Sequence, residues 1–227
     1  MAISFADLRF HLATKNTNYM QMNPVKEVCV ESYQETVAAV LAGATRIELC
    51  ENLSCGGTTP SYGTIKRVTE KLQIPVMVMI RPRGGDFCYS EEEYEIMKSD
   101  IQICRQLKAT GVVFGLLNPN HTIDLERTAE LVQLAQPMQV TFHKAIDESS
   151  DLLLAVSQLK TLGVNRILTS GGEDTAREGS NVLNEMIKIA DNQLKIIVAG
   201  KVTYENFEQI KKLIPSTDYH GRRLVKF

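Results

Sequence analysis

Ionisable side chains stand in or just after several short apolar runs of this sequence, and their types suit proton transfer and anion binding. Glu27 lies in "VKEVCV", Glu48 in "RIELC" and Arg81 at the end of "PVMVMIR", while His143 follows "QVTF" and Asp147 comes soon after. Carboxylates and imidazoles are common general acids and bases, and a guanidinium binds carboxylate or phosphate through a rigid fork of donors. These five residues form a candidate catalytic set for a small anionic metabolite.

Strand alternation decides which of these residues share a face. Residues two positions apart in a strand point the same way, which pairs Glu27 with Cys29 and Glu48 with Cys50. If these faces point inward, two carboxylates are buried, and burying a carboxylate costs several kcal/mol unless a positive charge compensates it. We therefore expect Arg81 to neutralise both glutamates. A satisfied ion-pair network without any ligand is the alternative.

The thiols of Cys29 and Cys50 suggest a metal site. Each follows a glutamate by two residues, on strands expected to be neighbours. Neighbouring parallel strands lie about 4.8 Å apart, so two inward thiols at the same level could hold one soft ion, and copper(I) prefers such ligands. The other interpretation is that both cysteines pack as small apolar residues, and the spacing alone favours it.

Two glycine-containing turns follow predicted strands, "TSGGE" from Thr169 and "VAGK" from Val198. Backbone N–H groups in such turns can bind an anion, as in the phosphate sites of barrel enzymes. The candidate anion-binding residues are Ser170, Gly171, Gly172 and Gly200. Glycine also serves tight turns between a strand and a helix, so a purely structural role fits the same pattern.

The elements that must position these residues alternate regularly. Short β-rich runs begin at Val25, Arg46, Pro75, Gly111, Gln139, Arg166, Lys195 and Tyr219, with helical patterns between them. Strands that alternate with helices pair in parallel, and eight of them predict an α/β fold, a closed TIM-type (β/α)8 barrel. An open doubly wound sheet is the alternative, but the turn after the first strand lacks the glycine-rich motif that binds dinucleotides.

Local signals predict where helices start and how the chain is divided. Thr59–Pro60 predicts an N-cap followed by proline, and "SEEE" at Ser90–Glu93 predicts a capping box. Only 7 residues follow His220, so we expect no full eighth helix. Residues 1–23 are predicted to be an N-terminal extension, and residues 24–227 a single barrel domain.

Composition argues against nucleic-acid and membrane partners. The chain has 25 Lys and Arg against 27 Asp and Glu, a net charge of −2, so we expect no basic surface for nucleic acid. No apolar run approaches the ~20 residues of a membrane helix. An odd number of cysteines, 5 in all, and the absence of a signal-peptide pattern predict reduced thiols in the cytoplasm.

Several of these segments together resemble the CutC copper homeostasis family. The resemblance lies in "KEVCVES", "GATRIELCENLSCGGTTPSYG", "MIRPRGGDFCYSEEE" and "VTFHKAID", in this order, and extends from about Pro24 to the end. It implies a TIM-barrel-like cytoplasmic protein, commonly oligomeric, that handles copper. It also implies that Cys29 and Cys50 are copper ligands, because the proposed copper-binding cysteines of the family lie in these segments.

Two functions follow from the sequence. The first is a copper homeostasis protein that binds copper(I) through Cys29 and Cys50. The alternative is a barrel enzyme of unassigned reaction that acts on a small anionic metabolite at the strand ends. A homodimer is expected for either, because a barrel without its last helix exposes an apolar flank that a second copy can cover.

Overall fold

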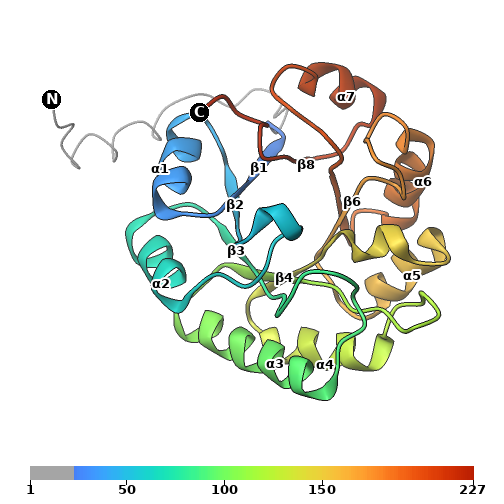
Figure 1. Cartoon of the computed structure of the whole chain (residues 1–227). Helices are drawn as coiled ribbons and strands as arrows, with labels where there is room; N and C mark the ends of the chain where they lie inside the picture. The colour runs from blue at the N-terminus through green and yellow to red at the C-terminus, as the bar shows by residue number, and fades with distance from the viewer. Residues whose placement is uncertain (1–22) are drawn as a thin grey trace, which may run out of the picture.

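The computed structural model describes residues 23–227, and its strands close into a parallel barrel ringed by helices (Figure 1). Each strand pairs with the next, and β8 pairs with β1. The strands are β1 (Val25–Val30), β2 (Arg46–Leu49), β3 (Val76–Met79), β4 (Gly111–Phe114), β5 (Gln139–Phe142), β6 (Arg166–Thr169), β7 (Lys195–Val198) and β8 (Asp218–His220). The predicted barrel is confirmed and the open sheet is wrong. The predicted extension, apart from Asn23, lies outside the described residues.

Helices connect the strands and cover the outside of the barrel (Figure 1). They are α1 (Tyr33–Leu41), α2 (Tyr62–Lys71), α3 (Glu91–Gln106), α4 (Leu125–Ala135), α5 (Leu152–Thr161), α6 (Ser180–Ala190) and α7 (Phe207–Leu213), with the short helices η2 (Leu53–Cys55) and η3 (Lys144–Glu148). No helix follows β8 in residues 23–227, as predicted, and Leu224 and Val225 of the last segment are buried. None of the described helices has both the length and the apolar character needed to cross a membrane.

The two predicted helix starts had different outcomes. Ser90 and Glu93 form the predicted capping box at the start of α3. The start predicted at Thr59 is wrong, because Ser61 caps α2 by accepting a hydrogen bond from the backbone N–H of Thr64 at 3.3 Å. The Thr59 hydroxyl instead accepts from the backbone N–H of Arg81 at 3.0 Å. This bond ties the loop before α2 to the end of β3.

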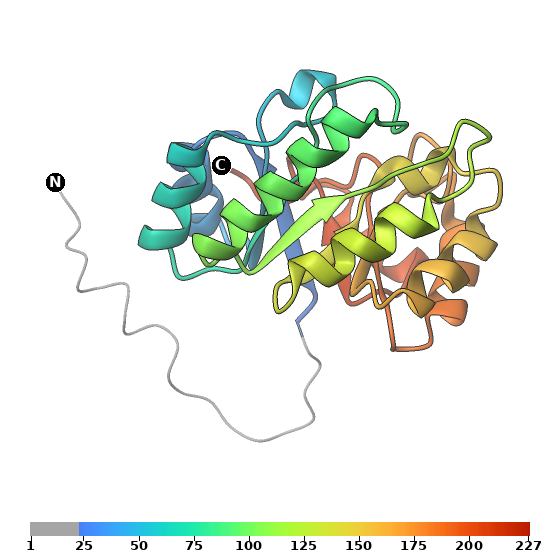
Figure 2. The same ribbon diagram turned by 90° about the horizontal axis from the view of Figure 1, so that it is seen from below.

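The carboxyl ends of parallel strands meet at one rim of the barrel. Figure 2 views the barrel from the side, with η2 beyond one end of it. Because η2 follows β2 and η3 follows β5, both short helices lie at this rim. The loops at the rim therefore determine what can reach the barrel interior.

Inside the barrel, Gly111 leaves room for a large neighbour. It pairs in register with Met77 on β3. A Cβ atom at Gly111 would lie 2.3 Å from the Met77 Cε and 2.5 Å from the Gln139 carbonyl oxygen. Glycine at this position lets the methionine side chain fill the interior, where Met77 is fully buried.

Candidate functional site

A buried ion-pair network lies inside the barrel between β1, β2 and β8. The Arg46 Nε donates to the carboxylate of Glu27, and its Nη1 lies 2.6 Å from the Asp218 Oδ1. The three residues are between 1% and 4% exposed. Strand register explains the contact, since Glu27 pairs with Arg46 across β1 and β2. Arg46 is therefore the partner of Glu27, and the expectation that Arg81 neutralises both glutamates is wrong.

The network holds Glu27 as a carboxylate. Burial alone would raise the pKa of Glu27, but the hydrogen bond with His220 and the positive charge of Arg46 lower it from 4.5 to about 2. The His220 Nδ1 lies 2.9 Å from the Glu27 Oε1. Because a carboxylate only accepts, Nδ1 carries the hydrogen and donates it. Glu27 thus fixes the orientation of the His220 ring.

Above this network, Cys29, Glu48 and His220 form a cluster that could hold a metal ion. One ligand atom from each of the three lies within 4.8 Å of the others. Cys29 pairs with Glu48 in register, and the His220 Nε2 lies 3.7 Å from the Glu48 Oε2. Burial opposes protonation of His220, but the negative charge of Glu48 raises its pKa well above the ordinary value. Burial also raises the pKa of Glu48, against the lowering effect of the His220 charge.

This cluster resembles the three-ligand metal sites of enzymes in its chemistry. Such sites use three protein ligands drawn from thiolate, imidazole and carboxylate donors and leave a further position open. A ligating histidine usually donates its other N–H to a carboxylate, as His220 does to Glu27. Metal binding requires a deprotonated thiol and imidazole nitrogen, so an ion would displace protons from Cys29 and His220.

Cys50 lies beside this cluster, two residues after Glu48 in the chain. Its Sγ is 3.6 Å from the Glu48 Oε2, and it packs with Met77, Met79 and Val113. Burial and the charge of Glu48 raise its pKa well above the ordinary value. Since Cys29 is level with Glu48, Cys50 is displaced by two residues, about 7 Å of strand. The two thiols are therefore not level, and their joint binding of copper stays a prediction.

Arg81 follows β3 by two residues, and its guanidinium is held by loop carbonyl groups. Nη1 donates to the carbonyl oxygens of Cys55 and Gly57 at 3.0 and 3.1 Å, and Nη2 donates to that of Gly85 at 2.7 Å. The Nε is buried and makes no hydrogen bond to the described residues. The charged group also lies over the ring of Phe87, 4.9 Å from its centroid. Arg81 thus joins the loops after β2 and β3 and keeps one donor free.

His143 is held as a neutral imidazole with a hydrogen-bond donor at Nε2. Its Nδ1 accepts from the backbone N–H of Ala145 at 3.2 Å, so the hydrogen resides on Nε2. Burial, with the nearby charge of Arg81, lowers the pKa of His143 to about 3. An imidazole with this pKa is neutral near neutral pH, and the proton-transfer role of His143 stays a prediction. Its Nε2 is buried without a partner among residues 23–227.

Asp147 occupies the turn where the sequence predicted an external anion. Its carboxylate accepts from the backbone N–H groups of Ser170 and Gly172 at 3.1 and 3.0 Å and from the hydroxyl groups of Thr169 and Ser170. The Lys144 Nζ lies 2.5 Å from the same carboxylate. The anion that these donors bind is therefore the carboxylate of Asp147, which belongs to the chain itself.

The other two predicted anion-binding residues also have internal roles. The Gly171 N–H donates to the Thr169 hydroxyl at 2.9 Å. Gly200 has a φ of +94°, and a Cβ atom there would lie 2.7 Å from the Ser170 Cβ. Both glycines allow close packing of the loops after β6 and β7. The prediction of an anion site at Ser170, Gly171, Gly172 and Gly200 is corrected accordingly.

A cavity of about 440 Å³ brings the remaining candidates together. Glu27 lies behind His220 and does not line it. The polar lining comes from three groups of residues: the metal-competent cluster, the two unpartnered donors and the Lys144–Asp147 pair. Apolar side chains complete the wall, and the lining includes Cys29, Glu48, His220, Arg81, His143, Lys144, Asp147, Leu53, Met79, Phe87 and Leu168.

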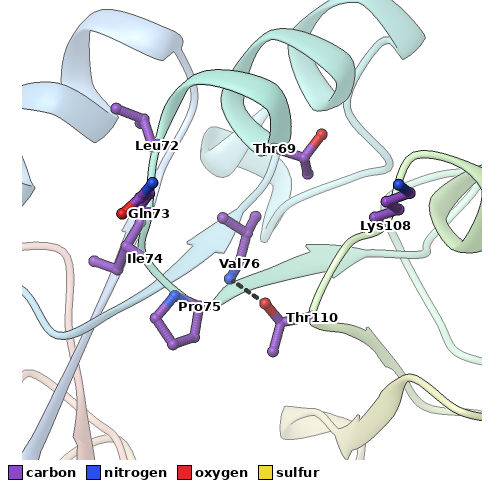
Figure 3. Close-up of a pocket in the computed structure, with 8 residues that line it drawn as sticks. All are labelled: Thr69, Leu72, Gln73, Ile74, Pro75, Val76, Lys108 and Thr110. Atoms are coloured by element: carbon purple, nitrogen blue, oxygen red, sulfur yellow. Dashed lines mark hydrogen bonds between the residues drawn. The ribbon is translucent and has the colours of Figure 1, made fainter.

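A second cavity, of about 310 Å³, lies at the opposite ends of the strands (Figure 3). It is formed by the segment before β3 and by Lys108 and Thr110 before β4. The Thr110 hydroxyl accepts from the backbone N–H of Val76 at 3.1 Å. Lys108 is its only ionisable residue among the described ones, so its lining offers no set of groups for chemistry.

The sequence-based site left out Arg46 and His220. Both follow from the strand alternation that identified Glu27 and Glu48. Arg46 precedes Glu48 by two residues, and His220 lies in register with Glu27 at the end of β8. Arg46 and His220 would have been found if the inward positions at both ends of each strand, including the eighth, had been searched for charged residues.

Comparisons with known proteins agree in pointing to one family. The sequence model of the CutC family matches residues 25–224. A copper homeostasis protein cutC homolog from Homo sapiens is 44% identical over 194 residues, which cover 86% of this chain and 71% of that protein. The homolog from Dictyostelium discoideum is 37% identical and covers 86% of this chain and 80% of its own.

A comparison with solved structures also points to the CutC family. The crystal structure of a CutC protein from Streptococcus agalactiae superposes with a TM-score of 0.85 at 36% identity, over 89% of this chain and 100% of that one. A deoxyribose phosphate aldolase from Aeropyrum pernix superposes with a TM-score of 0.63 at 12% identity, over 88% and 86%. The second likeness shows the barrel fold alone.

Proposed function

The chain belongs to the CutC family, whose relatives are named for copper homeostasis, and we propose that it binds copper(I) at the cluster of Cys29, Glu48 and His220. The observation that supports this most is the convergence of a thiol, an imidazole nitrogen and a carboxylate oxygen within 4.8 Å of one another. Copper is the cargo in this proposal, and the cluster is where it is held.

The cluster suits copper(I) because one of its three donors is a thiol and further sulfur atoms lie next to it. Thiolates and thioethers favour copper(I), and imidazole suits copper as well. Besides Cys29, the thioether of Met79 lines the same cavity, and Cys50 packs against Met79. The sulfur atoms of Cys50 and Met79 thus adjoin the cluster and favour a soft ion over a hard one. In this form the proposal keeps Cys50 as a candidate second thiolate.

The buried position of the cluster also fits cargo that must be protected. Cys29, Glu48 and His220 are 8%, 3% and 9% exposed, and the cavity is their connection to solvent. A thiolate that holds copper(I) out of water is shielded from oxidation and from exchange with other thiols. Glu27 contributes by orienting His220, and Arg46 by keeping Glu27 charged.

Anaerobic titration of the protein with copper(I) against a competing chelator tests the proposal. We expect the parent to bind one ion, and Cys29→Ser to lose more affinity than the about 10–100-fold that removal of an outer-shell partner costs. Glu27→Gln removes such a partner and is expected to fall within that range. Cys88→Ser is the matched control, since Cys88 is half-buried and does not line the cavity.

The single variants separate the possible ligand sets. Loss of binding in Cys29→Ser and His220→Gln, with retention in Cys50→Ser, favours the three-residue cluster. Equal loss in Cys29→Ser and Cys50→Ser favours the pair of thiols. Binding of copper(I) that none of these variants alters, or a parent that binds zinc(II) but not copper(I), would refute the proposal.

Two further features belong to this proposal. We place the activity in the cytoplasm, supported by five cysteines of which none is paired with another. We also propose a homodimer, supported by the exposed side chains of Phe227 and Tyr204, which are 50% and 39% exposed.

A further inference from the structure

Arg81 is a buried positive charge without a negative partner in the described part of the chain. It is 4% exposed, and the oxygens that accept from its guanidinium are neutral carbonyls. Burying an uncompensated charge is costly, and buried charges in proteins are normally paired. Arg46, at a similar depth, has two carboxylates. The contrast indicates that the partner of Arg81 comes from outside the chain.

Two unsatisfied donors lie beside this charge. The Arg81 Nε and the His143 Nε2 are both buried and have no hydrogen-bond acceptor within residues 23–227. Both side chains contact the ring of Phe87, whose centroid lies 4.9 Å from the Arg81 guanidinium carbon and 5.0 Å from the His143 ring centroid. Unpaired buried donors are rare in folded proteins, and each calls for an explanation.

The cavity brings a small molecule against the side chains that carry these donors. Arg81, His143 and Phe87 line the same space of about 440 Å³, which is in the size range of small-molecule sites. We propose that this space binds a small organic carboxylate, whose oxygens accept from Arg81 and His143 and whose carbon skeleton lies against Phe87, Met79 and Leu168. The carboxylate supplies the negative charge that Arg81 lacks.

The other charged groups of the cavity favour a ligand with a single negative charge, such as a carboxylate, over a doubly charged phosphate. Asp147 and Glu148 line the wall on the side of η3, so a dianion would meet repulsion there. His143 stays neutral because its pKa is about 3, so among the described residues that line the cavity Arg81 carries the one positive charge without a negatively charged partner. A ligand with one negative charge therefore balances the positive charge of Arg81. The inference does not depend on copper binding, because neither donor belongs to the metal-competent cluster.

Ligand-observed NMR on the metal-free, full-length protein tests the inference. The probes are the monoanions acetate, propionate and pyruvate, with acetamide and propionamide as neutral counterparts of similar size. We expect the carboxylates to bind and the amides to bind much more weakly. Arg81→Gln and His143→Phe should each weaken carboxylate binding by roughly tenfold or more, the factor expected for loss of a hydrogen bond involving a charged group.

Two controls make the result specific. Arg83→Gln removes the same charge from the same loop, but Arg83 pairs with Glu93 and does not line the cavity, so binding should be unchanged. Binding of carboxylates by the metal-free protein is the second control, because it separates this site from the copper proposal. If Arg81→Gln does not fold, His143→Phe provides the same test. Equal binding by the parent and the foldable variants, or no binding of any carboxylate by the parent, would overturn the inference.

Discussion

Replacing Glu27 with glutamine should remove a defined part of the acid sensitivity of this barrel. The pKa of Glu27 falls from 4.5 to about 2 on folding. At 1.36 kcal/mol per pKa unit, this corresponds to about 3 kcal/mol of stability. Because the folded-state pKa is lowered, this stability is present above pH 4.5 and is lost as the pH falls towards 2. Glutamine does not titrate, so Glu27→Gln lacks this contribution.

The assay is urea unfolding, followed by circular dichroism, at a series of pH values from 6 down to the lowest at which the parent stays folded. The difference in unfolding free energy between parent and Glu27→Gln should shrink as the pH falls. With a denaturant dependence of about 2 kcal/mol per molar urea, the full effect moves the midpoint by about 1.5 M. Glu185→Gln, on the exposed face of α6, is the control and should follow the parent. Parallel curves for parent and Glu27→Gln would show that the Arg46 and His220 contacts do not hold Glu27 as described.

Two further predictions concern packing and assembly. Gly111→Ala should destabilise the protein by about 1–3 kcal/mol, the usual cost of overpacking, because its Cβ would lie 2.3 Å from the Met77 Cε; a melting temperature equal to that of the parent would contradict this. Light scattering at micromolar concentration should give the mass of a dimer, and Phe227→Ser should shift the population towards the 25.3 kDa monomer. A parent that is monomeric throughout would remove the proposed homodimer.

The barrel followed from the sequence because its signals are local and repeated. Strands such as β3 and β4 are short runs of apolar residues, as expected where parallel strands are buried on both faces, and each connection contains a helical pattern. The start of α2 was missed because Thr59 and Ser61 are both good N-caps. The choice between them depends on the bond from the Arg81 N–H to Thr59, which joins residues 22 positions apart in the chain.

The site was harder to predict because pairing between charges depends on register. Sequence alternation gave the inward faces of Glu27 and Glu48 but not the level of each residue around the barrel. The register places Arg46 beside Glu27 and Cys29 beside Glu48, which reassigns the partner of the first glutamate and separates the two thiols. The role of His143 likewise depends on a single backbone contact, with Ala145, that fixes which ring nitrogen carries the hydrogen.

The carboxylate of Asp147 has a consequence for ligand selectivity. The turn after β6 offers backbone and hydroxyl donors of the kind that hold phosphate groups in many barrels of this type, and in this chain they are already saturated from within. A phosphorylated compound would have to displace a tethered anion and would then face its charge at close range. We therefore expect this turn to bind phosphate esters poorly, and a ligand of the barrel to be recognised by other groups.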